Sequence, residues 1–197
     1  MSNELSTEVR DGTLIVQFTR PEIRNPLSTS VLDRLYKVLN ETRSGRIIFT
    51  GSAESFASGA DLREIAMMTP ESAMSFAEYG QQLMTKVSQL PQLTIAAING
   101  YCFGGALDLA LACNVRIASP DAKFAHPGTG LGIITGWGGT QRLPRLVGRA
   151  NALEMFFSAS PIDAEHAARI GLIDSIAEDV LNAALSRRAS TNAHSIL

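Results

Sequence analysis

The sequence predicts a single domain of the α/β class, and two patterns lead to that class. Short apolar runs rich in β-branched residues alternate along the chain with longer segments of helical periodicity. A strand–loop–helix unit also recurs, at residues 46–68 and 94–113, and in both copies a glycine-containing turn leads into the helix. Because the 197 residues are 45 % apolar and no linker divides them, we expect one core and one domain over residues 1–197.

Strands and helices are expected to alternate through the N-terminal half of the chain. Residues 28–41 begin at a serine cap, either Ser28 or Ser30, and carry apolar residues on one face, so they predict a helix. A second helical stretch starts at Asp61, and a longer helix is expected over residues 70–90. The expected strands are the short apolar runs at residues 13–18, 46–50 and 93–98.

The C-terminal half continues this alternation around a glycine-rich loop at residues 126–139, HPGTGLGIITGWGG. Before the loop we expect an apolar helix at residues 106–113 and a strand at residues 115–118. After the loop we expect helices at residues 140–147, 150–157 and 163–170, and an extended segment at residues 172–176.

Charge and cysteine patterns exclude several classes of function. A net charge of −2 leaves no electrostatic footprint for nucleic acid or an anionic membrane. Arg142, Arg145 and Arg149 have helical spacing, which indicates a solvated helix face or, less simply, the rim of a phosphate site. Cys102 and Cys113 are too far apart in sequence for a C-x-x-C metal or redox pair, so we expect small buried hydrophobes. Without a signal peptide or a membrane-length apolar run, the expected location is the cytoplasm.

Two glycine-containing turns carry the expected chemistry. The first is Ser58-Gly59-Ala60-Asp61-Leu62, and the second runs from Asn99-Gly100 to Gly104-Gly105-Ala106. Each leads into a helix, whose N-terminus presents unpaired backbone N–H groups and a partial positive charge. Two such turns that face each other are able to hold one developing negative oxygen. Either turn alone is a weak signal, because glycine-rich helix starts usually serve close packing.

Five segments together resemble the crotonase (enoyl-CoA hydratase/isomerase) superfamily, over about residues 14–176. The segments are Arg20-Pro21-Glu22 through Asn25, Phe56 through Leu62, Ile98 through Gly105, Gly138 through Leu143, and Gly171-Leu172-Ile173. The resemblance implies a spiral of ββα units with surrounding helices and an enzyme that acts on acyl-CoA thioesters. It also implies a homotrimer or hexamer, no metal, and no cofactor besides the coenzyme A of the substrate. Nucleic acid and membrane are not expected among the partners.

The resemblance assigns site residues as well. The backbone N–H groups of Ala60 and Gly105 are expected to form an oxyanion hole that holds the thioester oxygen and stabilises its enolate. Arg24 is expected near the CoA phosphates, or else on the solvated surface. The other residues implied in substrate or CoA binding are Ser58, Asp61, Leu62, Gly104, Gly128, Gly136 and Trp137.

The acid–base groups depart from the family pattern. Hydratases of the family use two glutamates, and here Asp108 stands at the first position and Gly128 at the second. Water addition needs a base for the water and an acid for the α-carbon, and glycine supplies neither. Three solutions stay open: Asp108 acts alone, His126 transfers the proton, or Gly128 leaves room for a bound anion. Asp108 also fits a helix first turn, and His126 also fits a structural role.

Three further residues of the glycine-rich loop have open roles. Trp137 either walls the acyl pocket or fills the core, and Thr129 and Thr135 are polar neighbours able to position a water. Relative to the family, the C-terminal helical region from about residue 177 to residue 197 is short. Either the acyl pocket is therefore more open, or a neighbouring subunit covers it.

The expected reaction is hydration or isomerisation of an enoyl-CoA, with decarboxylation or hydrolysis as further choices, because all use the same oxyanion hole. The alternative is a non-catalytic acyl-CoA-binding or subunit-interaction protein of the same fold. A nucleotide-binding domain has little support, since residues 128–132 lack the third glycine of the dinucleotide motif and no P-loop occurs.

Overall fold

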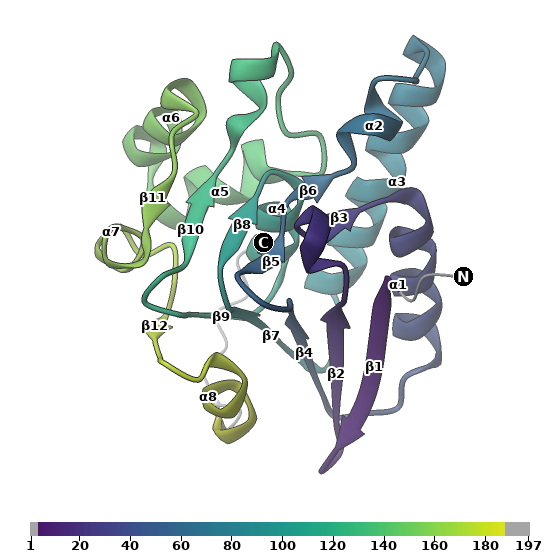
Figure 1. Ribbon diagram of the computed structural model, residues 1–197, viewed down its shortest axis with the longest axis vertical. Helices are drawn as coiled ribbons and strands as arrows, with labels where there is room; N and C mark the ends of the chain where they lie inside the picture. The colour runs from purple at the N-terminus through teal and green to yellow at the C-terminus, as the bar shows by residue number, and fades with distance from the viewer. Residues whose placement is uncertain (1–3, 188–197) are drawn as a thin grey trace.

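The computed structural model describes residues 4–187 and builds them around a six-stranded sheet (Figure 1). The first two strands pair antiparallel, and all other neighbours in this sheet are parallel. Parallel pairs need long crossover connections, which here carry most of the helices. In spatial order the strands are β1 (Leu5–Arg10), β2 (Thr13–Phe18), β4 (Arg46–Thr50), β7 (Leu93–Ile98), β9 (Val115–Ala118) and β12 (Ser175–Ile176).

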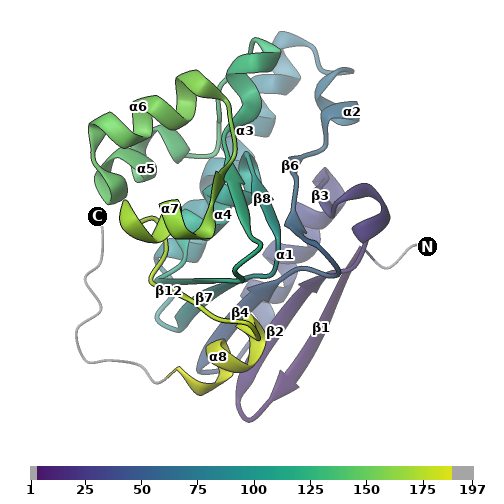
Figure 2. The same ribbon diagram turned by 60° about the vertical axis from the view of Figure 1, so that its left-hand side comes forward.

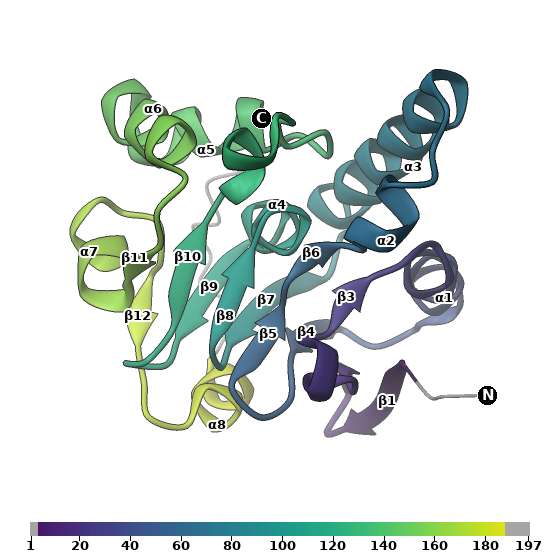
Figure 3. The same ribbon diagram turned by 45° about the horizontal axis from the view of Figure 1, so that its top comes forward.

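A second, four-stranded sheet turns the chain into a spiral. Its strands, in spatial order, are β11 (Ile162–Asp163), β10 (Lys123–Ala125), β8 (Tyr101–Phe103) and β5 (Ser55–Ala57). The chain leaves β4, β7 and β9 of the large sheet and enters β5, β8 and β10, respectively, as the next strand. Figure 3 shows these three short strands lying side by side in front of the large sheet. This repeat confirms the ββα spiral predicted from the sequence. A separate pair contains β3 (Pro26–Leu27) and β6 (Gly59–Ala60).

Helices cover both faces of the large sheet. The eight α-helices of the described part are α1 (Thr29–Glu41), α2 (Leu62–Ile65), α3 (Pro70–Ser88), α4 (Gly105–Ala112), α5 (Gly139–Val147), α6 (Arg149–Ser158), α7 (Ala164–Arg169) and α8 (Val180–Ser186). Two 3₁₀ turns, η1 (Pro21–Ile23) and η2 (Pro127–Leu131), complete the set. Figure 2 shows α5 and α6 together at one end and α8 at the other. The main core lies between the sheets and helices α1, α3, α4 and α5, whereas α8 packs on Ile48, Ile95 and Ile117 across the large sheet.

Helix starts follow the capping residues in the sequence. Of the two serines that the sequence left open, Ser28 is the cap of α1, and its hydroxyl accepts the N–H of Val31 at 3.3 Å. Ser30 is the second residue of the helix. Asp163 caps α7 in the same way and accepts the N–H of His166 at 2.8 Å. These caps satisfy backbone donors that the first helical turn leaves unpaired.

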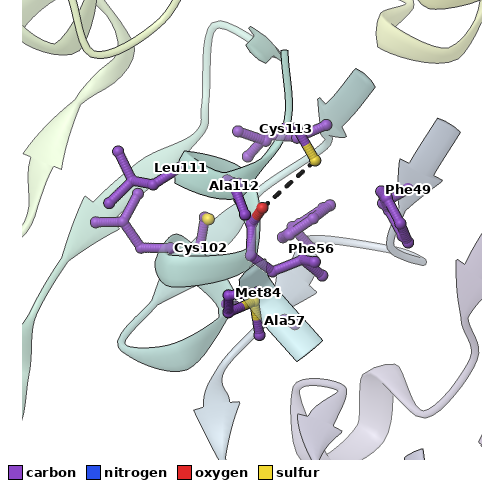
Figure 4. Close-up of a cluster of buried hydrophobic side chains, with 14 of the residues drawn as sticks. Phe49, Phe56, Ala57, Met84, Cys102, Leu111, Ala112 and Cys113 are labelled. Atoms are coloured by element: carbon purple, nitrogen blue, oxygen red, sulfur yellow. Dashed lines mark hydrogen bonds between the residues drawn. The ribbon is translucent and has the colours of Figure 1, made fainter. Parts of the chain in front are cut away.

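The two cysteines are buried, as predicted. Cys102 and Cys113 lie in the main core with Phe56 and Met84 (Figure 4). The Cys113 thiol donates to the carbonyl of Leu109 at 3.4 Å, and burial raises its pKa to about 12. Burial also raises the pKa of the Cys102 thiol. Both therefore remain neutral and act as small apolar side chains. Across residues 4–187 no helix combines the length and the apolarity that crossing a bilayer requires.

Sequence patterns missed or misjudged some elements for identifiable reasons. β1 was missed because four of its six side chains are exposed, and the second-sheet strands were missed because they are two or three residues long. The interpretation of Arg142, Arg145 and Arg149 as one helix face was wrong, since Gly148 separates α5 from α6. The C-terminal region includes α8, and residues 188–197 lie outside the described residues.

Candidate active site

The two glycine turns identified in the sequence meet in space. Gly59 has φ +92°, and a β-carbon placed on it would lie 2.6 Å from the carbonyl oxygen of Phe103 and 2.9 Å from the amide nitrogen of Gly105. No side chain fits at such distances, so glycine is required both for its backbone angle and for the close approach. The turn before α2 and the turn before α4 are therefore in direct backbone contact, with Ala60 and Gly105 on either side of it.

Hydrogen bonds between the two crossovers explain why the segments meet. The amide of Asn99 donates to the carbonyl of Ala53 at 2.7 Å, and its carbonyl oxygen accepts the N–H of Gly51 at 2.9 Å. The N–H of Tyr101 donates to the carbonyl of Glu54 at 3.0 Å. The Asn-Gly pair at residues 99 and 100 therefore clamps the β7–β8 turn onto the β4–β5 turn, and β8 and β5 follow in parallel.

A cavity of about 250 Å³ opens beside the two turns. It is mostly apolar, with walls from α2, α3, the start of α4 and the loop that follows β10. Of the residues predicted for the site, those that line it are Ser58, Ala60, Leu62, Gly104, Gly105, Asp108, His126, Gly128, Gly136 and Trp137. The spiral thus brings to one cavity residues from Ser58 to Trp137 that the sequence assigned separately.

Two predicted residues lie outside the cavity lining. Arg24 is exposed, and its guanidinium carbon stands 5.4 Å from the centre of the Tyr101 ring. Asp61 caps α2 by accepting the N–H of Arg63 at 2.9 Å, and its carboxylate also pairs with the Arg63 guanidinium at 2.6 Å. The side-chain hydrogen bond to Arg63 lowers the pKa of Asp61. Its carboxylate therefore fixes the start of the helix that forms one cavity wall.

Asp108 is the buried carboxyl group of the site. It lies on the first turn of α4, one turn after Gly105, and its side chain is fully buried. One carboxylate oxygen, Oδ2, accepts the hydroxyl of Thr135, whereas Oδ1 has no hydrogen-bond partner among residues 4–187. Burial raises the pKa of Asp108 to about 7, against the opposing effects of Thr135, the Trp137 N–H and the Arg142 charge. The group is therefore present in both protonation states near neutral pH.

His126 follows β10 and faces the same carboxyl group. Its side chain is 2 % exposed, and its Nε2 atom lies 3.7 Å from Asp108 Oδ1. That distance is too long for a direct hydrogen bond. Neither ring nitrogen has a hydrogen-bond partner in the described part of the chain, and the ring packs against Phe156 at 5.1 Å. Burial lowers the pKa of His126 to about 4, so the imidazole is neutral at physiological pH.

The space beside Gly128 is occupied by the protein itself. A β-carbon on Gly128 would lie 2.9 Å from the carbonyl oxygen of Ile133 and 3.3 Å from its Cγ1 atom. The Ile133 N–H in turn donates to the Gly128 carbonyl at 3.0 Å. The loop has closed over the position from which a second carboxylate would project. This geometry weakens the hypothesis that Gly128 makes room for an anion and favours the groups around Asp108.

Trp137 is at once a core residue and a cavity wall. It is 3 % exposed, and its ring stands edge-to-face with Phe76 at 5.3 Å. A β-carbon on Gly80 would lie 2.1 Å from the indole, and a β-carbon on Gly105 would lie 2.4 Å from it. The indole is therefore inserted between α3 and the first turn of α4. The two roles that the sequence left open for Trp137 are combined.

Two residues that the sequence analysis did not place in this site contact its lining. Gly139 begins α5, and a β-carbon there would lie 2.2 Å from Asp108 Oδ1 and 3.0 Å from His126 Cε1. Arg142, one turn later, donates to the Trp137 carbonyl at 3.2 Å and is half-buried. Both lie in the Gly138-to-Leu143 motif, so the signal was present in the sequence, but their roles depend on contacts across the fold.

A second cavity, of about 640 Å³, lies between α3, α4 and α5, on the far side of the Trp137 segment. Its lining includes the polar side chains of Gln81, Gln141 and Arg145, but it contains neither glycine turn, nor Asp108, nor His126. The smaller cavity is therefore the candidate active site despite its size.

Comparison with known proteins agrees with this geometry. A family model described as enoyl-CoA hydratase/isomerase matches residues 8–196. The chain belongs to this family. A probable enoyl-CoA hydratase of Bacillus subtilis (strain 168) is 41 % identical over 182 residues, which are 90 % of this chain and 70 % of that protein. A short-chain-enoyl-CoA hydratase of Clostridium acetobutylicum is 36 % identical over 181 residues, covering 89 % of this chain and 69 % of that protein.

Solved structures of enoyl-CoA hydratases match the fold as well. The crystal structure of enoyl-CoA hydratase from Bacillus anthracis is similar with a TM-score of 0.87 and 36 % identity, over 92 % of this chain and 74 % of that chain. These matches confirm the predicted membership of the enoyl-CoA hydratase/isomerase family and the predicted fold. At the two positions where the sequence analysis described glutamates, this chain has Asp108 and Gly128.

Proposed function

We propose that this protein binds an acyl-CoA thioester with its carbonyl oxygen between the N–H groups of Ala60 and Gly105, and catalyses reversible hydration of an enoyl-CoA. The observation that carries the proposal is the backbone contact between Gly59 and Gly105, which puts both turns on one cavity with a buried carboxyl group. As the first residue of α4, Gly105 has no carbonyl one turn back within the helix to accept its N–H. The names of the relatives support the substrate class.

The chemistry follows from where charge develops. Addition of water to the β-carbon, or removal of a proton from the α-carbon, moves an electron pair onto the thioester oxygen and forms an enolate. Preorganised N–H donors at a helix N-terminus stabilise that oxyanion, and each such donor typically contributes about 10²–10³-fold in rate. Asp108 lies one turn along the same helix, where its carboxyl group exchanges the α-proton. A homotrimer or hexamer, and no cofactor besides coenzyme A, belong to the same proposal through the resemblance.

Binding is tested by calorimetry with a matched pair of ligands. Butyryl-CoA carries the thioester oxygen, and S-butyl-CoA, its thioether, lacks it. Two neutral hydrogen bonds contribute about 1–3 kcal/mol together, so we expect the thioester to bind roughly tenfold more tightly. Equal affinity would contradict the oxyanion hole, and no binding of either ligand would contradict the proposal as a whole.

Enolate formation is tested by exchange of the α-protons of butyryl-CoA in deuterated water, followed by NMR. Since Asp108 must be a carboxylate to remove a proton, we expect exchange to increase as the pH rises through about 7. Binding without exchange would favour the alternative, a non-catalytic acyl-CoA-binding protein.

A further inference from the structure

The part of the cavity lined by Asp108 and His126 contains three buried polar atoms without a hydrogen-bond partner in the described chain. They are Oδ1 of Asp108 and both ring nitrogens of His126. Each buried polar atom left unpaired costs about 1–3 kcal/mol, so such atoms persist where a ligand, a water or a reaction uses them. Both residues line the 250 Å³ cavity, and their facing atoms, Nε2 and Oδ1, are 3.7 Å apart. No water molecule fits on the line between two atoms at that separation, so a water that contacts both must approach from the cavity side.

The surroundings decide which carboxyl oxygen is available. The hydroxyl of Thr135 donates to Oδ2 of Asp108, so that oxygen acts as an acceptor. The proton of the neutral acid therefore belongs on Oδ1, the atom that faces His126. Gly139 keeps this region open, because any side chain there would overlap Oδ1. Because the Thr135 hydroxyl occupies Oδ2 and Gly139 has no side chain near Oδ1, Oδ1 is the carboxyl oxygen that is able to donate a proton.

We propose that His126 is the second catalytic acid–base residue, and that its Nε2 works with Oδ1 of Asp108 on a water admitted from the cavity. This inference rests on the proposed function and supplies the group that Gly128 does not. His126 and Asp108 line the same cavity as the oxyanion turns, and the Gly104 N–H donates to the carbonyl of Ala125, the residue before His126, at 2.9 Å. The residue is thereby assigned to the water-adding half of the reaction.

His126 and Asp108 together account for every proton in the proposed reaction. As the water oxygen bonds to the β-carbon, Nε2 of neutral His126 takes a water proton, and the π electrons of the double bond move to form the enolate. The Asp108 carboxylic acid then donates its Oδ1 proton to the α-carbon, and the carbonyl re-forms. The imidazolium and carboxylate that remain are restored by one proton transfer from Nε2 to Oδ1 through the next water that enters, because 3.7 Å is too long for direct transfer.

The productive state has Asp108 protonated and His126 neutral, and burial favours this state for both groups. The charged or titratable neighbours are Arg142 from α5, which lowers the pKa of Asp108, and Cys102 from β8, which burial keeps neutral. Hydration should therefore show a bell-shaped pH profile with limbs near about 4 and about 7. Exchange of the α-protons of butyryl-CoA needs the Asp108 carboxylate. The exchange rate should therefore rise with pH near about 7, where the hydration rate falls.

The test compares hydration of crotonyl-CoA with α-proton exchange of butyryl-CoA in the full chain. His126→Gln keeps a polar side chain but cannot take a proton, and loss of one acid–base group costs about 10²–10⁴-fold. We expect hydration to fall by that factor, at least tenfold more than exchange, with the lower limb of the pH profile removed. His166→Gln is the matched control, because His166 lies on α7 outside the cavity and should retain wild-type hydration.

Two results would overturn the role of His126. One is hydration by His126→Gln within threefold of the wild type while thioester binding persists. The other needs no variant: a wild-type hydration rate that rises through about pH 7 excludes Asp108 as the acid of the pair. Failure of the proposed function itself is distinct, since the wild type would then neither bind nor exchange the thioester.

Discussion

The two walls of the cavity are built by different means. The oxyanion wall consists of backbone: Gly59 and Gly105 touch, and Asn99 holds the two turns together through hydrogen bonds to main-chain groups. The acid–base wall consists of side chains from three elements, Asp108 on α4, His126 after β10 and Thr135 in the loop before α5. A backbone wall tolerates substitution except where glycine is required, whereas a side-chain wall changes its chemistry with each residue. We therefore expect substitutions that change the reaction to lie on the acid–base wall.

The largest effect is expected from a substitution of Asp108, the carboxyl group of the acid–base wall. Asp108→Asn keeps the size of the side chain but removes the proton that it exchanges, so hydration and α-proton exchange should each fall by about 10²–10⁴-fold. Asp121→Asn, in the exposed turn between β9 and β10, is the control and should match the wild type. Activity of Asp108→Asn near the wild-type level would assign the proton to another group.

The next largest effect is expected from a substitution of Gly105 in the oxyanion wall. Gly105→Ala places a methyl group 2.4 Å from the Trp137 indole, and such overpacking typically costs about 1–3 kcal/mol of stability. Because α4 must shift away from Trp137, its first N–H moves as well, and thioester binding should weaken by about tenfold or more. Gly45→Ala is the control, since no atom lies within 4 Å of the added methyl group. Chemical denaturation and calorimetry measure both quantities; unchanged binding would separate Gly105 from the oxyanion hole.

The pH dependence of stability distinguishes the two walls, because only the acid–base wall contains groups that titrate. Asp108 has a folded pKa of about 7, above its ordinary value of 3.8, so its stabilising effect is complete below about pH 4 and is lost as the pH rises to about 7. His126 has a folded pKa of about 4, below 6.5, so its effect is complete above about pH 6.5 and is lost on acidification.

Denaturant unfolding of Asp108→Asn and the wild type should therefore differ by a pH-dependent amount. The free energy of unfolding of the variant, relative to the wild type, should increase between about pH 4 and about pH 7, by at most a few kcal/mol. A difference that does not change with pH would show that Asp108 titrates in the folded protein as it does in solvent.

The smallest effect concerns the hydroxyl that holds Asp108. Thr135→Val removes a hydrogen bond that lowers the pKa of Asp108, so the upper limb of the hydration profile should move to higher pH. Butyryl-CoA exchange near neutral pH should fall a few-fold, because less carboxylate is present. Thr129→Val is the control, since Thr129 instead donates to the Phe156 carbonyl at 2.5 Å. A limb that moves to lower pH, or not at all, would remove Thr135 from the site.

The same contrast explains what the sequence predicted and what it missed. Ala60 and Gly105 could be predicted because each sits in a local turn whose glycine signature is continuous in the sequence. The contact of Thr135 and Gly139 with Asp108 could not be predicted, because it depends on how α5 approaches α4. The strands of the large sheet other than β1 could be predicted from apolar runs in the sequence. The second-sheet strands were too short for any periodicity, although they create the spiral.

The most direct test of the central claim is a crystal structure of the protein with butyryl-CoA bound. The account predicts the thioester oxygen within about 2.7–3.2 Å of both amide nitrogens, of Ala60 and of Gly105, with the α-carbon beside Asp108. A thioester oxygen bound elsewhere, or an Ala60 or Gly105 N–H already donated to a main-chain carbonyl, would contradict it.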